Sequence, residues 1–335
     1  MTTTSPGGDD FGLLADSYRK ELLAHCYRML GSVDEAEDQV QETLLRAWRS
    51  YQDFEGRSSM RTWLYRIATN SCLRALETRA RRPLPSGLGA PAEDSSAPVA
   101  GPAQEVPWLQ PMPDVLISGS SADPASVVAS RAGIRLAMIA ALQYLPGRQR
   151  AVLILRDVLG WRAAEVAELL GTSPAAANSA LQRARTRMAS LAPAEEDIGE
   201  PGEPGLRDVL ERYAAAWEAA DVAALTELLR ADAVMEMPPL LTWFAGRTMI
   251  GQFLARVVLH RPGEFRMLPV AANGQPGFAA YLYQDGRYQA HAIQVLAVGG
   301  GRIGRLVSFN DAALFPAFGL PADYSATLRE RAPRP

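Results

Sequence analysis

The stretch from Phe54 to Asn70 reads FEGRSSMRTWLYRIATN and combines aromatic, cationic and apolar side chains. On both sides of it, apolar residues recur at spacings of three and four, and no proline occurs between Pro6 and Pro83. Such periodicity without a helix breaker predicts a compact helical domain over residues 11–82.

The segment from Asp34 to Tyr51 predicts an amphipathic helix. Its apolar stripe consists of Ala36, Val40, Leu44, Ala47, Trp48 and Tyr51, and its polar face includes Glu35, Asp38, Gln41, Glu42, Arg46 and Arg49. A solvated face is the ordinary interpretation of such a polar stripe, and a binding surface is the alternative. The segments that follow it favour the second interpretation.

Together these segments resemble region 2 of the sigma-70 family, in its short extracytoplasmic-function form. In that family, the helix that matches Asp34 to Trp48 docks on the clamp helices of the largest RNA polymerase subunit. The resemblance therefore implies polymerase binding by Asp38, Gln41, Glu42 and Trp48.

The same resemblance implies that the segment matching Phe54 to Arg61 captures a base flipped from the promoter −10 element, and that the next helix supplies further contacts. The residues implied are Phe54, Arg61, Trp63, Tyr65, Arg66, Asn70 and Arg74. Unstacking a base and holding the displaced strand requires aromatic faces together with cations. A place in the hydrophobic core is an equally good interpretation of Trp63.

Residues 83–124 are rich in Pro, Gly, Ser and Ala and show little periodicity, which predicts a flexible linker. Within it, VPWLQPMPD at residues 106–114 resembles a short motif of sigma factors that carry a C-terminal extension. A tryptophan between prolines suggests an interdomain docking element, with Trp108 and Leu109 as its anchors.

Helical periodicity resumes over residues 125–191, with breaks at Pro146-Gly147, Gly160 and Gly171-Thr172. A helix, a tight turn at Gly171 and a second helix predict a helix-turn-helix, in which Ser173 caps the second helix and Pro174 begins it. The exposed polar residues expected on that helix are Asn178, Gln182, Arg183, Arg185 and Arg187.

This second helical domain resembles sigma region 4, which reads the promoter −35 element, in the stretches DVLGW at 157–161 and ALQRAR at 180–185. Region 2, a linker and region 4 occur in the family's order. The partners implied are promoter DNA and core RNA polymerase, through its clamp helices and flap.

The net charge of −3 argues against nucleic-acid binding only if the charges are evenly spread. Arginines gather at residues 74–82 and 183–187, whereas acidic residues gather at 34–42 and at 195–203, within an acidic linker at 192–204. Neither a signal peptide nor an apolar run long enough for a membrane span occurs, which predicts a cytoplasmic protein. Cys26 and Cys72 are expected to be buried thiols, and no metal or cofactor is expected.

Residues 205–330 predict a third, α+β domain with a curved antiparallel sheet. Helices are expected at 205–219, 221–231 and 248–259, and strands at 233–237, 264–272, 277–284, 287–298 and 302–310. Asn273-Gly274, Asp285-Gly286 and the glycines at 299–301 are the expected turns. The pattern resembles the SnoaL-like or ketosteroid-isomerase-like cone, so the fold class is two all-α domains followed by an α+β cone.

Cones of this kind enclose a pocket, and the candidate pocket residues are Trp217, Met237, Trp243, Phe253, Tyr281 and His291. Each of them is more readily explained as core. Asp232, Glu236 and Tyr281 or Tyr283 could serve an isomerase, but no catalytic residue is assigned. The resemblance instead implies that the domain regulates the helical domains in cis, by contact with them and with the linker.

Two other functional classes remain open at this point. A one-component regulator would join the helix-turn-helix to a ligand-binding domain, but it leaves residues 11–82 without a purpose. An isomerase or cyclase fused to a DNA-binding module explains only the C-terminal pocket.

Overall fold

The computed structural model describes residues 8–54, 56, 58–99, 101–117, 133–191 and 205–324. The predicted acidic linker at 192–204, the end of the first linker at 118–124 and the predicted start of the second helical domain at 125–132 lie outside these residues. The chain divides into two compact units. The helical unit comprises Met1–Arg82 and Asp114–Ala192, and the C-terminal unit comprises Pro83–Pro113 and Pro193–Pro335.

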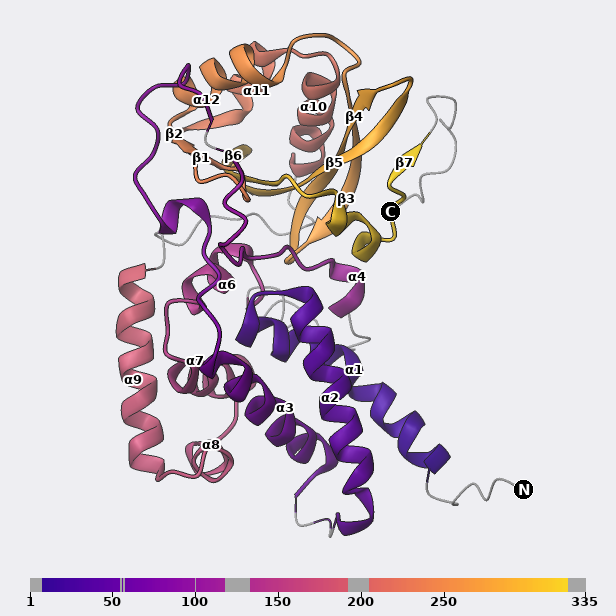
Figure 1. Ribbon diagram of the computed structural model, residues 1–335. Coiled ribbons are helices and arrows are strands. Elements are labelled where there is room, and N and C mark those ends of the chain that lie inside the picture. Colours follow the sequence, from indigo (N-terminus) through magenta and orange to yellow (C-terminus); the bar gives the residue numbers. More distant parts are fainter. Residues whose placement is uncertain are drawn as a thin grey trace, which may run out of the picture. The chain divides into compact units, whose positions relative to one another are not determined.

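The first part of the helical unit is built from three long helices that pack side by side (Figure 1). They are α1 (Gly8–Leu30), α2 (Val33–Arg49) and α3 (Met60–Glu77), with a 3₁₀ turn at Tyr51–Asp53 between α2 and α3. Each of the last two begins at a serine cap. Ser32 Oγ accepts from Glu35 N at 3.3 Å, and Ser59 Oγ accepts from Thr62 N at 3.1 Å.

The second part of the helical unit contains shorter helices. They are α4 (Asp114–Ile117), α6 (Leu136–Leu142), α7 (Gly147–Leu153) with a π turn at Ile154–Val158, α8 (Ala163–Leu169) and α9 (Pro174–Leu191). Gly171 has a φ of +60° at the turn between α8 and α9, and Ser173 Oγ accepts from Ala176 N at 3.2 Å. The predicted helix-turn-helix and its cap are confirmed.

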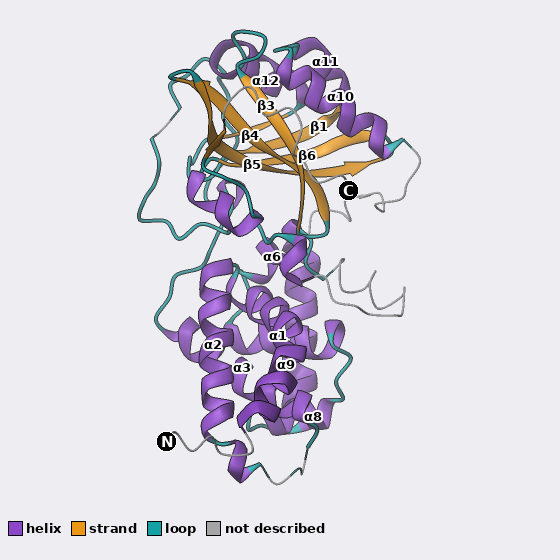
Figure 2. Cartoon of the chain, turned by 90° about the vertical axis from the view of Figure 1, so that its right-hand side faces the viewer, coloured by secondary structure: helices purple, strands orange, loops and turns teal. Residues whose placement is uncertain are grey.

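The C-terminal unit is a strongly bent sheet with three helices on one face (Figure 2). The helices are α10 (Leu206–Glu218), α11 (Val222–Leu228) and α12 (Arg247–Phe253), the last extended by a π turn at Leu254–Val258. The strands are β1 (Leu229–Glu236), β2 (Trp243–Ala245), β3 (Phe265–Ala272), β4 (Gln275–Gln284), β5 (Arg287–Gly299), β6 (Arg302–Phe309) and β7 (Asp323–Tyr324). Two 3₁₀ segments, Pro85–Gly87 and Ala312–Phe318, complete it.

The strand order is β2-β1-β6-β5-β4-β3, and β7 pairs with β5. The three predicted turns are present, with left-handed backbone at Asn273-Gly274, Asp285-Gly286 and Gly300-Gly301. The expectation of a purely antiparallel sheet was wrong, because β1 pairs with β6 in parallel. The helix expected at 221–231 ends at Leu228, since Leu229 already begins β1.

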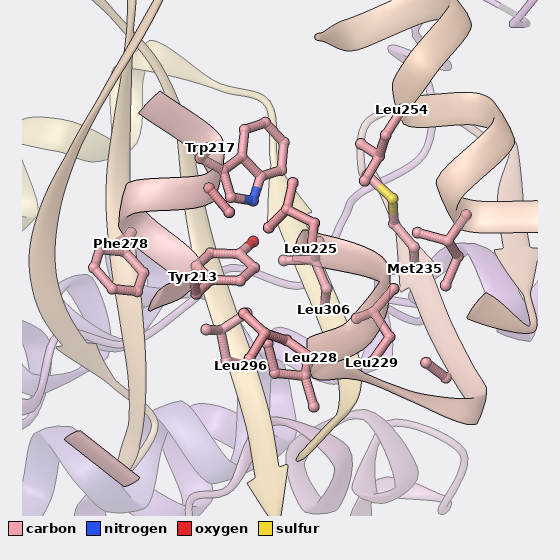
Figure 3. Packing of buried hydrophobic residues seen from close by; sticks show 14 of the residues in the cluster. Tyr213, Trp217, Leu225, Leu228, Leu229, Met235, Leu254, Phe278, Leu296 and Leu306 are labelled. Atoms are coloured by element: carbon pink, nitrogen blue, oxygen red, sulfur yellow. The ribbon is translucent and has the colours of Figure 1, made fainter. Parts of the chain in front are cut away.

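A hydrophobic core fills the space between the helices and the concave face of the sheet (Figure 3). Tyr213 and Trp217 from α10 point into it and meet Phe278 of β4 and Phe265 of β3, with ring centroids 5.5 Å apart for Tyr213–Phe278 and 5.4 Å for Trp217–Phe265. The Tyr213 hydroxyl donates to Gln294 Oε1 at 2.8 Å, so its burial leaves no lone donor.

Residues 83–113 of the segment expected to be a flexible linker belong to the C-terminal unit, and residues 83–99 and 101–113 are described. Leu109 N donates to Pro83 O at 3.3 Å, which joins the two ends of a loop of residues 83–109. Pro113 forms an isolated antiparallel bridge with Ala272, at the end of β3. A bridge to β3 and hydrogen bonds thus attach the described part of this segment to the C-terminal unit.

At Gly277, strand β4 packs closely against the backbone of strand β5. A Cβ at this position would lie 2.2 Å from Gln294 O on β5. We expect Gly277→Ala to lower the free energy of unfolding of the C-terminal unit by about 1–3 kcal/mol, the usual effect of forcing atoms into a packed interior. Urea unfolding followed by circular dichroism measures it.

Gly101→Ala is the matched control, since nothing lies within 4 Å of its Cβ position. Its free energy of unfolding should stay within about 0.5 kcal/mol of the parent. Equal stabilities for the two variants would contradict the close approach of β4 and β5.

Candidate functional site

Helix α2 presents an exposed face with large apolar side chains. Trp48 is 56% exposed and Leu45 is 41% exposed, although Ala36, Val40 and Ala47 on the opposite face are buried. Asp38 and Gln41 are exposed as well, and Glu42 accepts a hydrogen bond from Arg46. The structure therefore brings the four residues predicted to bind polymerase to one surface, where an exposed tryptophan is typical of an interaction site.

The aromatic residues of the predicted −10 surface divide into two groups. Phe54 and Trp63 are half-buried, with ring centroids 4.8 Å apart. Tyr65 is buried, and its ring makes an edge contact with Trp161 at 5.8 Å. In this conformation Phe54 and Trp63 offer a partly accessible aromatic surface, whereas Tyr65 lies in the core of the helical unit.

Two of the predicted −10 arginines are held by carboxylates. Arg61 Nε lies 2.8 Å from Glu21 Oε2, and Arg66 Nη2 lies 2.5 Å from Glu168 Oε1 on α8. Arg74 is exposed near the end of α3, and Asn70 is half-buried. Glu21 and Glu168 were missed by sequence reasoning, because they lie 40 and 102 residues away from their partners.

The two helical domains pack against each other within the helical unit. Besides the pair Arg66–Glu168 and the ring contact of Tyr65 with Trp161, Arg28 Nε donates to Gly133 O at 3.1 Å. Arg150 of α7 donates to the carbonyl oxygen of Met29 on α1. The residues predicted to contact the −10 element and those predicted to contact the −35 element thus lie in one compact unit.

Helix α9 carries the second set of predicted DNA contacts. Asn178, Gln182 and Arg183 are exposed, while Ala177, Leu181 and Ala184 face the core. Arg185 differs from Arg183, because its guanidinium makes two hydrogen bonds to the carboxylate of Asp157, at 2.9 and 2.6 Å. These hydrogen bonds raise the pKa of Arg185, which stays charged.

Arg187 is also engaged, since its Nε donates to Tyr144 O at 3.2 Å. All five predicted residues are exposed, and Arg185 and Arg187 differ from the other three in being held by partners within the helical unit. Side chains of these types bind base edges and phosphates in a major groove.

The loop of residues 83–113 is attached along the C-terminal unit by backbone hydrogen bonds. Trp243 Nε1 donates to Gly89 O at 3.0 Å, and Ala92 N donates to Trp243 O at 2.8 Å. Met112 N donates to Asn273 Oδ1 and Asn273 N donates to Met112 O, both at 2.9 Å. The attachment thus reaches from β2 to the β3–β4 turn.

The two predicted docking anchors lie in this loop. Leu109 is 1% exposed, and the Trp108 indole donates to Ala103 O at 3.1 Å within the loop itself. Ala103 N in turn donates to Pro239 O at 3.0 Å. Leu109 is thus buried, and the indole of Trp108 bonds within the loop, so interdomain docking by these two residues stays a prediction.

A buried carboxylate on β1 also holds the loop. Glu236 has no exposed surface, and its carboxylate lies 2.5 Å from Arg305 Nη1 on β6. Its other oxygen accepts from Ser86 N at 2.9 Å. Both oxygens of Glu236 therefore have partners within the C-terminal unit, and neither oxygen faces an open site as a catalytic base would.

The other candidate acid–base groups of the cone have structural partners as well. Asp232 accepts two hydrogen bonds from Arg230, at 3.0 and 2.9 Å. The Tyr281 hydroxyl donates to Pro321 O at 2.9 Å, and Tyr283 is 47% exposed. Among the described residues, this gives no carboxylate opposite a donor in an apolar cavity.

The six predicted pocket residues do not form one group. Trp217, Met237 and Phe253 belong to the hydrophobic core cluster. Trp243 binds the loop through its indole, and Tyr281 packs on Phe315 with ring centroids 5.0 Å apart. His291 contacts the ring of Phe265, and burial lowers the pKa of His291, so it is neutral near pH 7.

The described part of the chain holds no cluster of His, Cys, Asp and Glu that could bind a metal ion. Cys26 and Cys72 are free, buried thiols, as predicted. None of the helices described combines the length and the hydropathy that crossing a bilayer requires.

Models of known families match all three domains. Sigma-70 region 2 matches residues 14–82, sigma-70 region 4 matches 135–188, and the SnoaL-like domain matches 210–306. The ECF RNA polymerase sigma factor SigG of Mycobacterium tuberculosis is 49% identical over 314 residues, which cover 93% of this chain and 84% of SigG.

The related ECF sigma factor SigJ of Mycobacterium tuberculosis is 30% identical over 294 residues, covering 84% of this chain and 85% of SigJ. The crystal structure of SigJ superposes with a TM-score of 0.62 and 25% identity, over 92% of this chain and 99% of that structure.

The buried residue His25 makes the stability of the helical unit depend on pH. It has no exposed surface, and its Nε2 lies 2.9 Å from Thr69 Oγ1. Burial, and then the charges of Arg28 and Arg61, lower the pKa of His25 to about 3. A histidine in the unfolded chain takes up its proton near pH 6.5. Between these values the unfolded state binds more protons, so stability falls as the pH falls.

We expect the free energy of unfolding of the helical unit to fall by about 1.4 kcal/mol for each pH unit below 6.5 through this group alone. His25→Gln should lose that share of the slope. Urea unfolding at pH 7.5 and pH 5.5 measures it, with His260→Gln as control, because His260 is exposed. An unchanged slope in His25→Gln would contradict a neutral, buried imidazole.

Proposed function

We propose that this chain, which belongs to the extracytoplasmic-function sigma factors of the sigma-70 family and directs promoter-specific transcription initiation, reads its −35 element with the exposed face of α9. The observation that carries the proposal is the exposure of Asn178, Gln182 and Arg183 on the second helix of a capped helix-turn-helix. Helix α9 contains no acidic residue that would repel phosphates.

The −10 element is proposed to bind at α3 and the turn before it. The half-buried pair Phe54 and Trp63 supports this role, because an unstacked base needs an aromatic partner. Arg74 is exposed beyond this pair on α3 and can contact phosphate. Arg61 and Arg66 join them only after they leave Glu21 and Glu168.

Core RNA polymerase is proposed to bind the exposed face of α2. Trp48 and Leu45 supply apolar area, and Asp38, Gln41 and Glu42 supply the polar contacts around it. The proposed place of action is the cytoplasm, where the polymerase and the chromosome meet.

Promoter binding requires the two helical domains to separate. The −10 and −35 elements are distinct sites on the duplex, and each base pair adds about 3.4 Å between them. Contacts such as Arg66–Glu168 and Tyr65–Trp161 hold the domains together in the helical unit. We therefore interpret this arrangement as a closed, resting state.

The C-terminal unit is proposed to regulate this separation through the loop of residues 83–109. An extended chain spans about 3.3–3.6 Å per residue, so these 27 residues could add roughly 90 Å of reach between the helical domains. The hydrogen bond from Leu109 N to Pro83 O brings the loop's ends together and removes that reach. Attachment of the longer segment 83–113 to β1, β2 and the β3–β4 turn stabilises the short form.

The C-terminal unit is accordingly proposed to act as a binding module and not as an enzyme. Its candidate base Glu236 is used to hold Arg305 and Ser86. Members of this fold serve several functions, so the fold by itself assigns none of them.

The two arginines on α9 give a direct test of the −35 proposal. We expect Arg183→Ala to weaken binding of the holoenzyme to promoter DNA by about 1–3 kcal/mol if the residue reads a base. Arg185→Ala should affect binding less, because the Arg185 guanidinium is engaged by Asp157. Fluorescence anisotropy on promoter and random duplexes measures both.

An equal loss for Arg183→Ala on both duplexes would mark a phosphate contact. A larger loss for Arg185→Ala than for Arg183→Ala would contradict the choice of Arg183 over Arg185 as the DNA-contacting residue.

Release of the loop should raise transcription. The double variant Trp243→Phe and Asn273→Ala removes the side-chain hydrogen bonds to Gly89 O and Met112 N. We expect a several-fold higher yield of promoter-specific transcript at limiting protein, because each lost hydrogen bond shifts the equilibrium by about 0.5–1.5 kcal/mol. Run-off transcription with bacterial core polymerase on genomic promoter fragments measures the yield.

Arg207→Gln, on the exposed surface of α10, is the control and should leave the yield unchanged. Deletion of residues 205–335 tests the same restraint by removing the support of the loop. A lower yield from the double variant would contradict inhibition by the loop, and equal yields from all forms would contradict regulation by this unit.

A further inference from the structure

A cavity of about 220 Å³ lies in the helical unit, between the C-terminal end of α3 and the α6–α7 connection. Its polar lining residues are Glu35, Arg79, Arg81, Arg82, Gln143 and Arg150. Residues from both helical domains thus form its wall.

The charges of this lining are strongly unbalanced. Four guanidinium groups face a single carboxylate, that of Glu35, which pairs with Arg79 and with Arg82 at 2.6 Å. Arg81 lies over the ring of Tyr144, 4.1 Å from its centroid. Among the described residues that line the cavity, guanidinium groups outnumber carboxylates by three.

Arg150 contributes a buried charge without a counter-ion. Its side chain is 3% exposed, and its hydrogen bonds run to the neutral oxygens of Met29, Gln143 and Leu145. Its Nε has no hydrogen-bond partner in the described structure. Burial lowers the pKa of Arg150 to about 10, which leaves it charged near pH 7.

The thiol of Cys72 does not supply the missing charge, because burial raises its pKa well above the usual value and keeps it neutral. A buried guanidinium without a carboxylate or another anion is destabilising, since its desolvation is not offset by charge pairing. An anion in the cavity would provide that pairing.

We propose that this cavity binds a phosphate-bearing anion with two linked phosphate groups, such as the diphosphate end of a small molecule. Guanidinium groups match phosphate oxygens in geometry and charge. Each phosphate carries about −1.5 to −2 near pH 7, so two of them balance the excess charge of the lining. The volume is below the roughly 300 Å³ at which pockets for drug-sized ligands begin, which suits a charged group more than a whole cofactor.

Isothermal titration calorimetry of the full-length protein with sodium pyrophosphate tests the proposal. We expect saturable binding, weakened roughly tenfold by Arg79→Gln and by Arg81→Gln, because each removes a charge-assisted hydrogen bond. Arg207→Gln is the matched control, since it removes one exposed guanidinium on α10. Arg79 pairs with Glu35 on α2, so the second variant, Arg81→Gln, keeps the test informative if Arg79→Gln unfolds.

A second arm identifies the source of the phosphate. Binding of a random-sequence DNA duplex is measured by fluorescence anisotropy for the same variants. Weaker duplex binding by Arg81→Gln than by Arg207→Gln, without pyrophosphate binding, would assign the phosphate site to the DNA backbone. The proposal is overturned if pyrophosphate does not bind and the duplex does not distinguish the two variants, or if Arg207→Gln weakens pyrophosphate as much as Arg81→Gln.

Discussion

Buried backbone groups need hydrogen-bond partners even where the chain forms no helix or strand, and this requirement determines how the sigma domains are connected. Residues 83–113 contain too many prolines to pair regularly. Some of their backbone N–H groups donate to side chains of the C-terminal unit instead. Ser86 N donates to the carboxylate of Glu236, and Met112 N donates to the side-chain oxygen of Asn273. Residues 83–113, the first part of the link between regions 2 and 4, therefore belong to the C-terminal unit.

The regular elements could be predicted because local rules govern them. Serine caps, the glycine at the turn of the helix-turn-helix and the Asn-Gly and Asp-Gly hairpins act within a few residues. The parallel pairing of β1 with β6 could not be predicted, since the alternation of apolar and polar residues along a strand does not indicate which strand it pairs with. The composition of residues 83–113 does not reveal their hydrogen-bond partners for a similar reason, because those partners lie up to 161 residues away in the sequence.

The same limit applies to the predicted site residues, because their burial and their partners depend on residues far away in the sequence. Arg183 and Arg185 are the same residue type on the same helix, yet the hydrogen bonds to Asp157 come from Arg185. Tyr65 and Trp63 are both aromatic residues of α3, yet only Tyr65 is fully buried. Residue type limits what a position can do, and long-range partners decide which positions are available for it.

Two buried charged residues show how the partners of a side chain indicate whether its role is structural. Glu236 and Arg150 have almost no exposed surface. Glu236 meets Arg305 within its own unit, so its charge is balanced and holds a loop in place. Arg150 meets only neutral oxygens, and removing such a group from water is unfavourable without a counter-charge. Balanced burial explains a structural role for Glu236, whereas the charge of Arg150, which has no carboxylate partner, is the basis of the proposed anion site.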